Sequence, residues 1–304
     1  MRVIVSGASG LIGTALVPAL RAAGHEVGRL VRGAATVPGD VPWSPGEGVI
    51  DAAGLEGVDG VVHLSGESIF AGLRRWTTAK RIRIRESRVG TTALLARTLA
   101  GLSRKPGVLV LITGSGFYGD RGDELLTEES PGGTGFLADV SREWEAAALP
   151  ATAAGLRLVS LRTGLVLDRR GGLLGPLLPP FRLGVGGPIG RGRRYWSWIT
   201  IDDLIAVFRF ALESSALAGP VNTASPNPVT NGEFARVLGR VLARPALIPV
   251  PPAALRLLFG REAANETILT SARLVPARLL AAGFQFRFPE VEGALRHVLR
   301  PDSR

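Results

Sequence analysis

A doubly wound α/β fold on a parallel sheet, followed by a small and mainly helical C-terminal lobe, is the architecture that the sequence predicts. Strand-like and helix-like segments alternate along most of the chain, which is typical of parallel sheets built from βαβ units. The segment 107–113 is a continuous apolar run, as expected for a central strand covered on both faces. From residue 220 onward, prolines separate short helical segments. We therefore expect a main domain at 1–220, with an irregular excursion at about 168–198, and a C-terminal lobe at 221–304.

The individual elements follow from the hydrophobic spacing and from the residues that interrupt it. Strands are expected where β-branched or continuous apolar residues cluster, at 2–6, 26–32, 58–65, 107–113, 156–163 and about 198–201. Helices are expected where apolar residues recur every three or four positions, up to about residue 23 and at 77–100, 140–154 and 202–213. The segment 33–57 is rich in glycine, proline and other turn formers, so we expect it to be irregular.

The composition limits the chemistry that the chain can perform. Its 304 residues contain no cysteine, which excludes disulfides, zinc–thiolate sites and cysteine nucleophiles. The three histidines, His25, His63 and His297, lie far apart in the sequence, so no metal site is expected. The net charge of +10 comes almost wholly from arginines spread along the chain. We interpret them as a solvated basic surface that attracts a phosphorylated cofactor, and we expect no nucleic-acid partner.

The sequence predicts neither a membrane segment nor a secretory signal. The first residues lead directly into a strand and lack the apolar run and cleavage site of a signal peptide. No stretch approaches the ~18 uninterrupted apolar residues of a membrane-spanning helix. We therefore expect a cytoplasmic protein without a membrane partner.

A glycine-rich loop, Gly7-Ala8-Ser9-Gly10-Leu11-Ile12-Gly13, joins the first strand to the first helix. In this context Gly7 permits a tight turn, Gly10 lets backbone amides approach a pyrophosphate, and Gly13 lets the helix pack closely on the strand. The helix N-terminus offers unpaired N–H groups and the positive end of its dipole to the phosphates. The loop therefore predicts a Rossmann-type dinucleotide site; the alternative is an ordinary glycine-rich turn.

The end of the second strand indicates which dinucleotide is bound. An NAD site usually has an acidic residue there, whereas an arginine accommodates the 2′-phosphate of NADP. The local sequence Arg29-Leu30-Val31-Arg32 contains no acid, and Arg32 can pair with a phosphate in a bidentate manner. Ser9 offers a further hydroxyl contact in the loop. We expect NADP (NADPH) as the cofactor; the alternative for Arg32 is a solvated loop charge.

Further motifs extend along nearly the whole chain. They are Gly7–Gly13, His63–Glu67, Arg75-Trp76, Ser87-Arg88, Thr113–Gly119, Thr127–Ser130, Trp144-Glu145, Trp196–Ile199, Asp202-Asp203, Val221–Pro228 and Pro276–Phe288. Together they resemble the extended and atypical short-chain dehydrogenase/reductases. Within these the chain is similar to the subgroup named for nucleoside-diphosphate-sugar epimerases, which carries a small helical C-terminal domain.

The resemblance implies roles for several residues. Leu64, Ser65 and Gly66 would line the adenosine and ribose side of the cofactor, and Arg88 would reach back to it from a helix. Near the nicotinamide, the residues implied are Thr163, Gly164 and Leu165. The resemblance also places Ser115 at the hydroxyl position upstream of the usual catalytic tyrosine.

The Tyr-x-x-x-Lys pair of this superfamily is absent. Such a pair lies on one helix face, where the lysine lowers the tyrosine pKa for proton exchange with substrate. The only tyrosines here are Tyr118 and Tyr195, and the residues four positions later are Gly122 and Ile199. The expected helix reads Phe136-Leu137-Ala138-Asp139-Val140-Ser141. The usual mechanism is therefore excluded, whereas dinucleotide binding is not.

Three residues are candidates for a rearranged acid/base set. Ser115 and Tyr118 follow a strand end, where ligands bind in α/β sheets, and Glu67 follows Gly66 and is expected to point into the cleft. For each there is a structural alternative: a turn serine, a packed tyrosine with a satisfied hydroxyl, and a glutamate that caps the next element. The acids at 128–129 and 143–145 are interpreted as surface charge.

Three functions stay open on the sequence. The first is an NADP(H)-dependent oxidoreductase or epimerase acting on a small carbonyl- or hydroxyl-bearing substrate, for instance a nucleotide sugar. The second is an NADP(H)-binding sensor or partner-binding module without turnover. The third is a lyase- or isomerase-like reaction that uses the nicotinamide only as a bound group.

Overall fold

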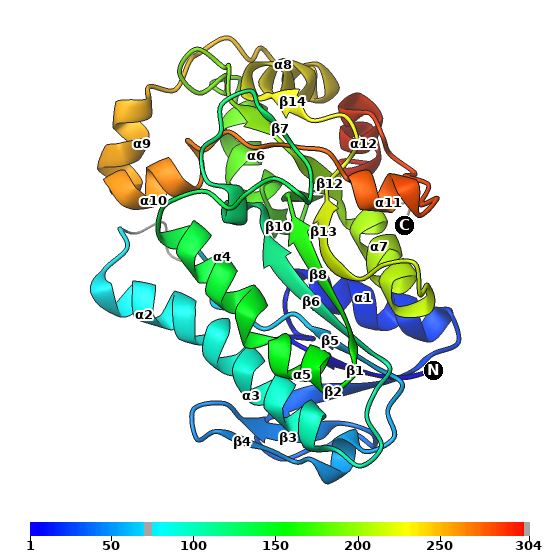
Figure 1. The fold of residues 1–304 in the computed structure, drawn as a ribbon. Helices are drawn as coiled ribbons and strands as arrows, with labels where there is room; N and C mark the ends of the chain where they lie inside the picture. The colour runs from blue at the N-terminus through cyan, green and yellow to red at the C-terminus, as the bar shows by residue number, and fades with distance from the viewer. Residues whose placement is uncertain (70–74, 301–304) are drawn as a thin grey trace.

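The computed structural model describes residues 1–69 and 75–300 (Figure 1). Within them, an eight-stranded sheet has the order β13-β8-β6-β5-β1-β2-β3-β4. Its strands are β1 (Arg2–Ser6), β2 (Glu26–Arg32), β3 (Val41–Ser44), β4 (Val49–Ile50), β5 (Gly60–His63), β6 (Val108–Gly114), β8 (Arg157–Thr163) and β13 (Gly219–Thr223). All neighbours are parallel except β4, which is antiparallel to β3. The predicted doubly wound fold is confirmed.

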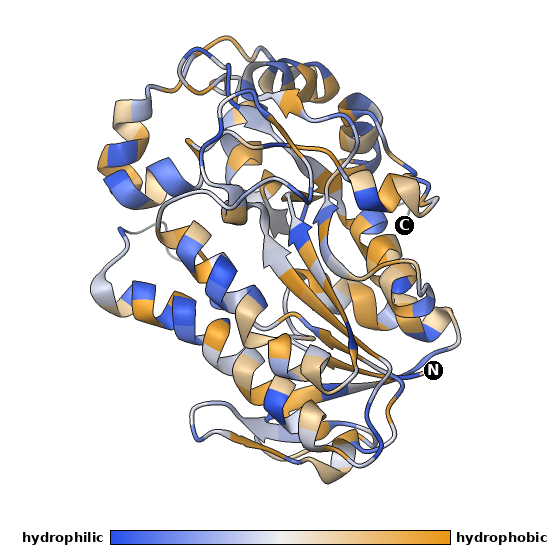
Figure 2. Ribbon diagram, in the orientation of Figure 1, coloured by the Kyte–Doolittle hydropathy of each residue, from blue (hydrophilic) through white to orange (hydrophobic). Residues whose placement is uncertain are grey.

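Helices cover both faces of this sheet (Figure 1). They are α1 (Leu11–Ala22) and α7 (Ile201–Glu213) on one face, and α3 (Val89–Gly101), α4 (Phe136–Ala147) and α5 (Leu149–Ala153) on the other. Because side chains alternate along a strand, Val3 and Val5 of β1 enter the core beneath α1 and α7, and Ile4 enters the opposite core. Figure 2 shows the central strands as largely hydrophobic, consistent with burial on both faces.

The helix expected at 77–100 is divided in two. α2 (Thr78–Glu86) ends before Ser87, and α3 begins after Arg88. The Ser87 hydroxyl accepts a hydrogen bond from the Glu67 N–H at 2.8 Å, so this residue is engaged by the loop that follows β5. The break places Arg88 at the N-terminus of α3, facing the end of the sheet.

Two further expectations about local structure are wrong. The segment 33–57 contains β3 and β4, which extend the sheet beyond β2. Val41 and Trp43 are buried on alternate positions of β3, but Pro42 and the glycine-rich flanks mask this short pattern. The helix expected at 140–154 begins earlier, at the start of α4, and is interrupted before α5.

The remaining residues form the C-terminal side of the molecule. β9 (Leu165–Asp168), β10 (Gly171–Gly172) and β12 (Trp198–Thr200) form a small sheet, so the expected excursion is partly regular. The other elements are η1 (Ala53–Leu55), η2 (Ser115–Tyr118), β7 (Leu125–Leu126), α6 (Leu174–Arg182), β11 (Tyr195–Trp196), β14 (Val229–Thr230), α8 (Asn231–Leu242), α9 (Pro252–Phe259), α10 (Arg261–Glu266), β15 (Arg273–Leu274), α11 (Ala277–Ala281) and α12 (Val291–Val298). β13, which straddles the expected boundary at 220, pairs with β8 in the main sheet.

The C-terminal side has its own apolar core, in which Trp196 and Trp198 pack with Phe234 and Leu295. Both tryptophans are buried, so they are residues of this core and do not line an open cleft. None of the helices within residues 1–69 and 75–300 combines the length and the apolarity that crossing a lipid bilayer requires.

Candidate functional site

The strand order reverses between β1 and β5, because β1 leads to β2 on one side while β5 lies on the other. In open parallel sheets, ligands bind in the crevice outside the carboxyl ends of the strands at such a point. The glycine loop leaves β1 here, and the turn after β5 lies beside it. The topology thus brings Gly7 and the segment Leu64–Gly66 together.

The three loop glycines meet different surroundings. Gly7 has φ +65°, and a Cβ on it would lie 2.8 Å from the carbonyl carbon of Leu64. A Cβ on Gly13 would lie 2.4 Å from the Gly7 oxygen. A Cβ on Gly10 would meet only the Gly7 oxygen, at 3.4 Å. Gly7 and Gly13 therefore hold the loop against β5 and α1, while Gly10 leaves its outer side open to a ligand.

The N-terminus of α1 is free to bind an anion. Its N-cap, Gly10, has no side chain to cap the first turn, and no acidic residue lies in that turn. Ser9 is exposed beside it. Unpaired backbone N–H groups and the helix dipole favour a phosphate at such a position. The residues present therefore fit a pyrophosphate group.

Arg32 lies exposed at the carboxyl end of β2. Its side chain has no hydrogen bond or ion pair with any residue that the structure describes. The nearby acid Asp40 is already engaged, because Arg29 Nε donates to its Oδ1 at 3.0 Å. The arrangement leaves a free guanidinium, without a competing carboxylate, where a 2′-phosphate would lie.

A buried hydrogen-bond chain fixes the ends of β1 and β5. The Ser6 hydroxyl lies 2.6 Å from His63 Nδ1, and His63 Nε2 lies 3.2 Å from the Thr91 hydroxyl of α3. Thr91 donates its own hydrogen to the Ser87 carbonyl at 2.8 Å, so it accepts from Nε2–H. The hydrogen bonds therefore assign a neutral imidazole with its proton on Nε2.

The same chain reaches the predicted cofactor residues. Because His63 Nδ1 accepts from Ser6, the Ser6 oxygen is free to accept from the Leu64 N–H and from the Ser65 hydroxyl, each at 3.1 Å. Burial lowers the pKa of His63 to about 3, so the ring stays neutral near pH 7. From the sequence, His63 was named only as one of three scattered histidines and as part of the motif His63–Glu67, and it was given no role, although a polar residue at the end of an apolar strand was the available signal.

A cavity of about 230 Å³ lies beyond the ends of β5 and β6, and we call it the inner pocket. It is lined by polar and charged groups of Arg88, Thr113 and Ser141, by Gly66 and Gly114, and by apolar side chains of Leu64, Ile69, Ile112, Leu137, Val140 and Trp144. Its size and its mixed wall are typical of a site for part of a small molecule. The sequence had pointed to Leu64, Gly66 and Arg88 in this wall but not to Thr113 or Ser141.

Arg88 brings a buried positive charge to the inner pocket. Its side chain is 9% exposed, its guanidinium lies 5.2 Å from the centre of the Trp144 ring, and Nη1 donates to the Ile84 carbonyl. No carboxylate among the described residues forms an ion pair with it. Burial lowers the pKa of Arg88 to about 10, an effect that Glu67 opposes, and the group stays charged near pH 7. Arg88 is thus placed to hold an electron-rich group.

The three residues that the resemblance places near the nicotinamide, Thr163, Gly164 and Leu165, lie where β8 ends. Thr163 is buried, and Gly164 forms the turn into β9 that starts at Leu165. A Cβ on Gly164 would lie 2.5 Å from the Ser197 oxygen, so only glycine fits between β9 and the segment before β12. This close approach brings the end of β8 and the C-terminal side together.

Of the predicted catalytic residues, Ser115 keeps an accessible position. It begins η2, is half-buried, and its hydroxyl bonds to no side chain or backbone group that the structure describes. Glu67 is instead paired with Lys80, whose Nζ lies 2.7 Å from Oε1. The hydrogen bond from Lys80 lowers the pKa of Glu67, so this group is a stabilised carboxylate and a poor proton donor.

Tyr118 is fully buried, and the structure argues against its predicted catalytic role. Its hydroxyl donates to Asn222 Oδ1 at 2.6 Å and accepts from Arg162 Nη1 at 3.0 Å. Burial raises its pKa. The structural alternative, a packed aromatic residue with a satisfied hydroxyl, describes this position.

Two acids interpreted as surface charge, the buried Glu128 and the half-buried Glu145, are in fact partners of groups in the sheet. Glu128 Oε1 accepts from the backbone N–H of Asn222 at 3.0 Å, and Glu145 forms a double hydrogen bond with Arg162, each at 2.8 Å. The interpretation is wrong because both partners are distant in sequence, on β8 and β13. Within residues 1–69 and 75–300, no group of three or more His, Asp or Glu side chains is placed to hold a metal ion.

On α4, the helix where the resemblance would lead one to expect a Tyr–Lys pair, two positions with that spacing are apolar. Phe136 and Val140 are one helical turn apart, and both pack in a cluster with Ile84 of α2. A Tyr-x-x-x-Lys spacing is therefore occupied by side chains that cannot exchange a proton.

Comparisons with known proteins agree with this architecture. A family model described as the NAD dependent epimerase/dehydratase family matches residues 3–223, which is most of the chain. The chain belongs to the NAD dependent epimerase/dehydratase family. A second model, described as a domain of unknown function (DUF1731), matches residues 250–298. The resemblance found in the sequence is confirmed.

Individual members of this epimerase/dehydratase family are similar over nearly the whole chain. Epimerase family protein SDR39U1 of Bos taurus is 43% identical over 302 residues, covering 98% of this chain and 100% of the relative. The crystal structure of human epimerase family protein SDR39U1 (isoform 2) with NADPH has a TM-score of 0.90 and 40% identity, covering 98% of this chain and 99% of that one. The nucleoside-diphosphate sugar epimerase of Corynebacterium glutamicum has a TM-score of 0.79 and 37% identity, covering 98% of this chain and 58% of that one.

Proposed function

We propose that this chain binds NADP(H) in the crevice at the ends of β1, β2, β5 and β6. The observation that carries the proposal is the uncapped N-terminus of α1, together with the exposed, unpaired side chain of Arg32 at the end of β2, the strand next to β1. The first suits a pyrophosphate and the second a 2′-phosphate. The human relative that was solved with NADPH supports the same cofactor.

The proposed reaction is that of an atypical oxidoreductase or epimerase on a small carbonyl- or hydroxyl-bearing substrate. When bound, NADP(H) would supply or accept a hydride. The positive charge of Arg88 would bind an electron-rich group in the inner pocket, and the Ser115 hydroxyl would hydrogen-bond the substrate oxygen. The apolar side chains of the pocket would exclude water from the reacting atoms. A nucleotide sugar remains a proposed substrate, and the cytoplasm the proposed compartment.

A second candidate function is an NADP(H)-binding module without turnover. It is favoured by two observations: Phe136 and Val140 of α4 are apolar, and Tyr118 is buried. Neither position therefore supplies a tyrosine that a lysine could activate as a general acid. The two candidates differ in whether the bound cofactor is consumed. NADPH that never oxidises with any member of a panel of aldehydes, ketones and nucleotide sugars would favour the module.

The first test is a titration of the purified protein with NADPH and with NADH, followed by cofactor fluorescence. We expect NADPH to bind more tightly than NADH. Arg32→Glu should weaken NADPH binding by ~10-fold or more, because it replaces a charge-assisted phosphate contact by repulsion, and shift the preference toward NADH.

The matched control is Arg97→Glu, which makes the same change of charge at an exposed position of α3. It should leave the ratio of the two dissociation constants unchanged. An unchanged ratio in the Arg32 variant would show that the 2′-phosphate lies elsewhere. Failure of the native protein to bind either nucleotide would contradict the proposed function itself.

A further inference from the structure

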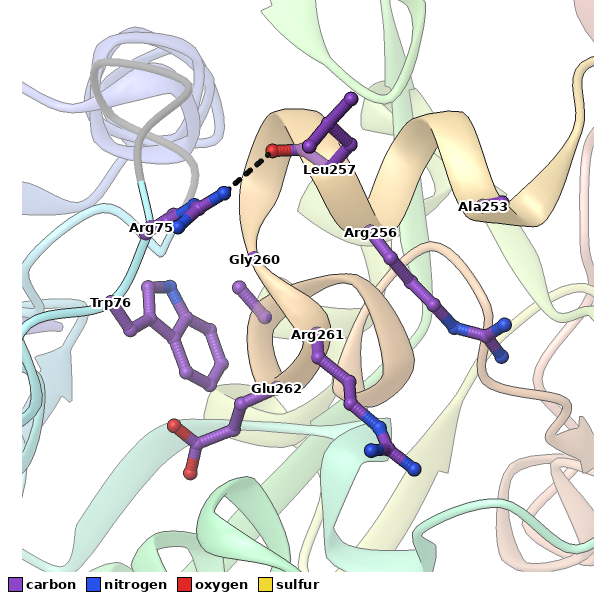
Figure 3. A pocket seen from close by; sticks show the side chains of 9 residues that line it. Arg75, Trp76, Ala253, Arg256, Leu257, Gly260, Arg261 and Glu262 are labelled. Atoms are coloured by element: carbon purple, nitrogen blue, oxygen red, sulfur yellow. Dashed lines mark hydrogen bonds between the residues drawn. The ribbon is translucent and has the colours of Figure 1, made fainter.

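The inner pocket differs from a larger cavity near the C-terminal helices in how its polar groups are arranged. The larger cavity, of about 550 Å³, lies where the segment before α2 meets α9 and α10 (Figure 3). Figure 3 shows the side chains of Arg256 and Arg261 pointing away from Trp76, so these groups are not aimed at one ligand. The inner pocket, of about 230 Å³, is instead lined together by a charged group and two hydroxyl groups, which come from three different elements.

The two hydroxyl groups in the wall of the inner pocket can only accept a hydrogen bond from a ligand. The Thr113 hydroxyl of β6 donates its hydrogen to Glu145 Oε1 at 3.3 Å. The Ser141 hydroxyl of α4 donates its hydrogen to the Leu137 carbonyl at 2.7 Å. A carboxylate and a carbonyl oxygen have no hydrogen to give, so the direction of both bonds is fixed. Each hydroxyl oxygen therefore offers only lone pairs, and the ligand group beside it must be a hydrogen-bond donor.

The charged group of the inner pocket is the buried guanidinium of Arg88. Its Nη1 donates to the Ile84 carbonyl at 3.1 Å and to the Ser87 hydroxyl at 3.4 Å. Nε and Nη2 donate to no group within residues 1–69 and 75–300. A buried cation without an anionic partner is unfavourable, and a carboxylate accepts two N–H bonds from one guanidinium. The ligand group that lies beside Arg88 should therefore be a carboxylate.

Helix α4 brings the charged donor and the two acceptors around one small space. The Arg88 guanidinium lies 5.2 Å from the centre of the Trp144 ring, and Ser141 precedes Trp144 by three residues, on the same side of the helix. The residue after Trp144 is Glu145, which holds the Thr113 hydroxyl. The pocket is smaller than the ~300–1,000 Å³ that is usual for drug-sized ligands, so its ligand has few bonds between the carboxylate and the donor.

The rest of the wall identifies the donor as a neutral hydroxyl. No carboxylate is among the residues that line the pocket. A ligand ammonium would lie near the charge of Arg88 without an acid to compensate it, whereas a hydroxyl carries no charge. The other side chains in the wall are apolar and suit an apolar part of the ligand; they are Leu64, Ile69, Ile112, Leu137 and Val140.

We propose that the inner pocket selects a small 2-hydroxy acid with an apolar side chain. Arg88 binds the carboxylate, Thr113 and Ser141 accept the hydrogen of the hydroxyl group, and the apolar wall contacts the side chain. This assignment names the substrate class of the proposed function and rests on it. The preference for a carboxylate with a neighbouring hydroxyl stands on the pocket itself. The resemblance had implied instead that Arg88 contacts the cofactor, and the test distinguishes the two roles.

The test is calorimetric titration of the protein saturated with NADPH, because a reduced cofactor and a hydroxy acid cannot react with each other. The probes are 2-hydroxy-3-methylbutanoate, 3-methylbutanoate, which lacks the hydroxyl, and 2-hydroxy-3-methylbutanamide, which lacks the charge. We expect the hydroxy acid to bind with one site per chain and each of the other two to bind ~10-fold more weakly or worse. Equal binding of the hydroxy acid and 3-methylbutanoate, or no binding of the hydroxy acid, would overturn the proposal.

Variants of the wall test which residue reads which group. Thr113→Val/Ser141→Ala should bring the ratio of the dissociation constants of the hydroxy acid and 3-methylbutanoate close to one, because both acceptors are lost. Thr98→Val is the matched control, since its hydroxyl donates to the Leu94 carbonyl of α3 at 3.0 Å and does not line the pocket; it should keep the native ratio. Arg88→Gln should remove the preference for the acid over the amide. Native ratios in the double variant and in Arg88→Gln would contradict the assignment.

NADPH affinity, measured beforehand by fluorescence, reports on the proposed function separately. If NADPH does not bind, the acids are titrated without it, because every wall of the pocket belongs to this chain, and the preference is tested all the same. If Arg88→Gln abolishes NADPH binding and the native protein does not bind the hydroxy acid, Arg88 belongs to the cofactor site and the proposal is wrong.

Discussion

His63 shows how one buried side chain organises the edge of the site. It joins Ser6 of β1 to Thr91 of α3, and through Ser6 it fixes the Ser65 hydroxyl. A charged imidazole cannot make these bonds, because Nδ1 must accept a hydrogen from Ser6. Burial also opposes the charge, and so the folded protein keeps this ring neutral down to a pH of about 3.

This difference predicts a loss of stability in mild acid. The His63 pKa is lowered from 6.5 in the unfolded chain to about 3 in the fold, so below pH 6.5 only the unfolded state takes up the proton. Its contribution to stability is therefore complete above pH 6.5 and is lost as the pH falls toward 3. Between pH 7.5 and 5.0, His63 should remove ~2 kcal/mol from the free energy of unfolding.

Urea unfolding at the two pH values measures this loss. His63→Gln lowers stability at both, but its decrease between pH 7.5 and 5.0 should be smaller than that of the native protein by the same ~2 kcal/mol. His25→Gln serves as the control, because the His25 ring is hydrogen-bonded to Glu213 at 3.0 Å and does not belong to the chain at Ser6. If His63→Gln and the native protein lose equal stability, the neutral buried ring is not the cause.

At the scale of elements, the junction of β1 and α1 depends on one close approach. A Cβ on Gly13 would lie 2.4 Å from the Gly7 oxygen and 2.6 Å from Cα of Ala8. Gly13→Ala must therefore displace the loop that offers its N–H groups to the cofactor. We expect a stability loss of ~1–3 kcal/mol, as for other overpacked positions, and NADPH binding weakened by ~10-fold or more.

Gly293→Ala is the matched control, because Gly293 also lies within a helix, α12, but its Cβ would meet nothing within 4 Å. Alanine should stabilise that helix by ~0.5–1 kcal/mol and leave NADPH binding unchanged. Denaturant unfolding and cofactor fluorescence measure both effects. Equal responses of the two variants would mean that the loop tolerates a side chain at Gly13.

The sequence predicted this junction because its signals are local: a short apolar strand, three spaced glycines and a helix follow one another within a few residues. β3 was not predicted, because the alternation of Val41 and Trp43 is short and interrupted by Pro42. The inner pocket was only partly predicted. Thr113 and Ser141 meet there from β6 and α4, and no local pattern shows that two such distant segments face one cavity.

Local sequence patterns do not show which distant segments meet, and this is also why Glu128 and Glu145 were wrongly interpreted as surface charge. Glu145 lies on a helix with a polar, solvent-facing pattern, so its spacing suggested surface charge. Its partner Arg162 comes from the interior of β8, where a buried cation requires an anion from a neighbouring element. Sequence patterns give the periodicity of each element, but the pairing of two buried charges depends on how the elements pack.

At the scale of the whole molecule, this buried pair is the centre of a network that joins the two sides of the protein. Arg162 contacts Glu145 of α4 and the hydroxyl of Tyr118, which in turn donates to Asn222 of β13. Asn222 Nδ2 donates at 3.0 Å to the carbonyl of Val275, in the C-terminal part of the chain. The guanidinium also lies 3.5 Å from the centre of the Phe117 ring.

Replacing only Glu145 should therefore lower the free energy of unfolding more than replacing both Glu145 and Arg162. Glu145→Leu leaves Arg162, which is 4% exposed, as a buried charge without its partner, and should reduce the free energy of unfolding by ~3–5 kcal/mol. Glu145→Leu/Arg162→Leu also removes that charge, so the double variant should be more stable than the single one. Denaturant unfolding of the native protein, both single variants and the double variant gives the coupling energy.

The same variants test whether the network supports the inner pocket. Thr113 lines that pocket, and its hydroxyl donates to Glu145 Oε1 at 3.3 Å, so Glu145→Leu frees a pocket side chain as well as a buried charge. NADPH binding should weaken in the single variant at temperatures where the protein stays folded. If the stability losses of the two single variants add up to that of the double variant, Arg162 finds other partners when Glu145 is removed. If the NADPH affinity is unchanged, α4 does not position the pocket through Glu145.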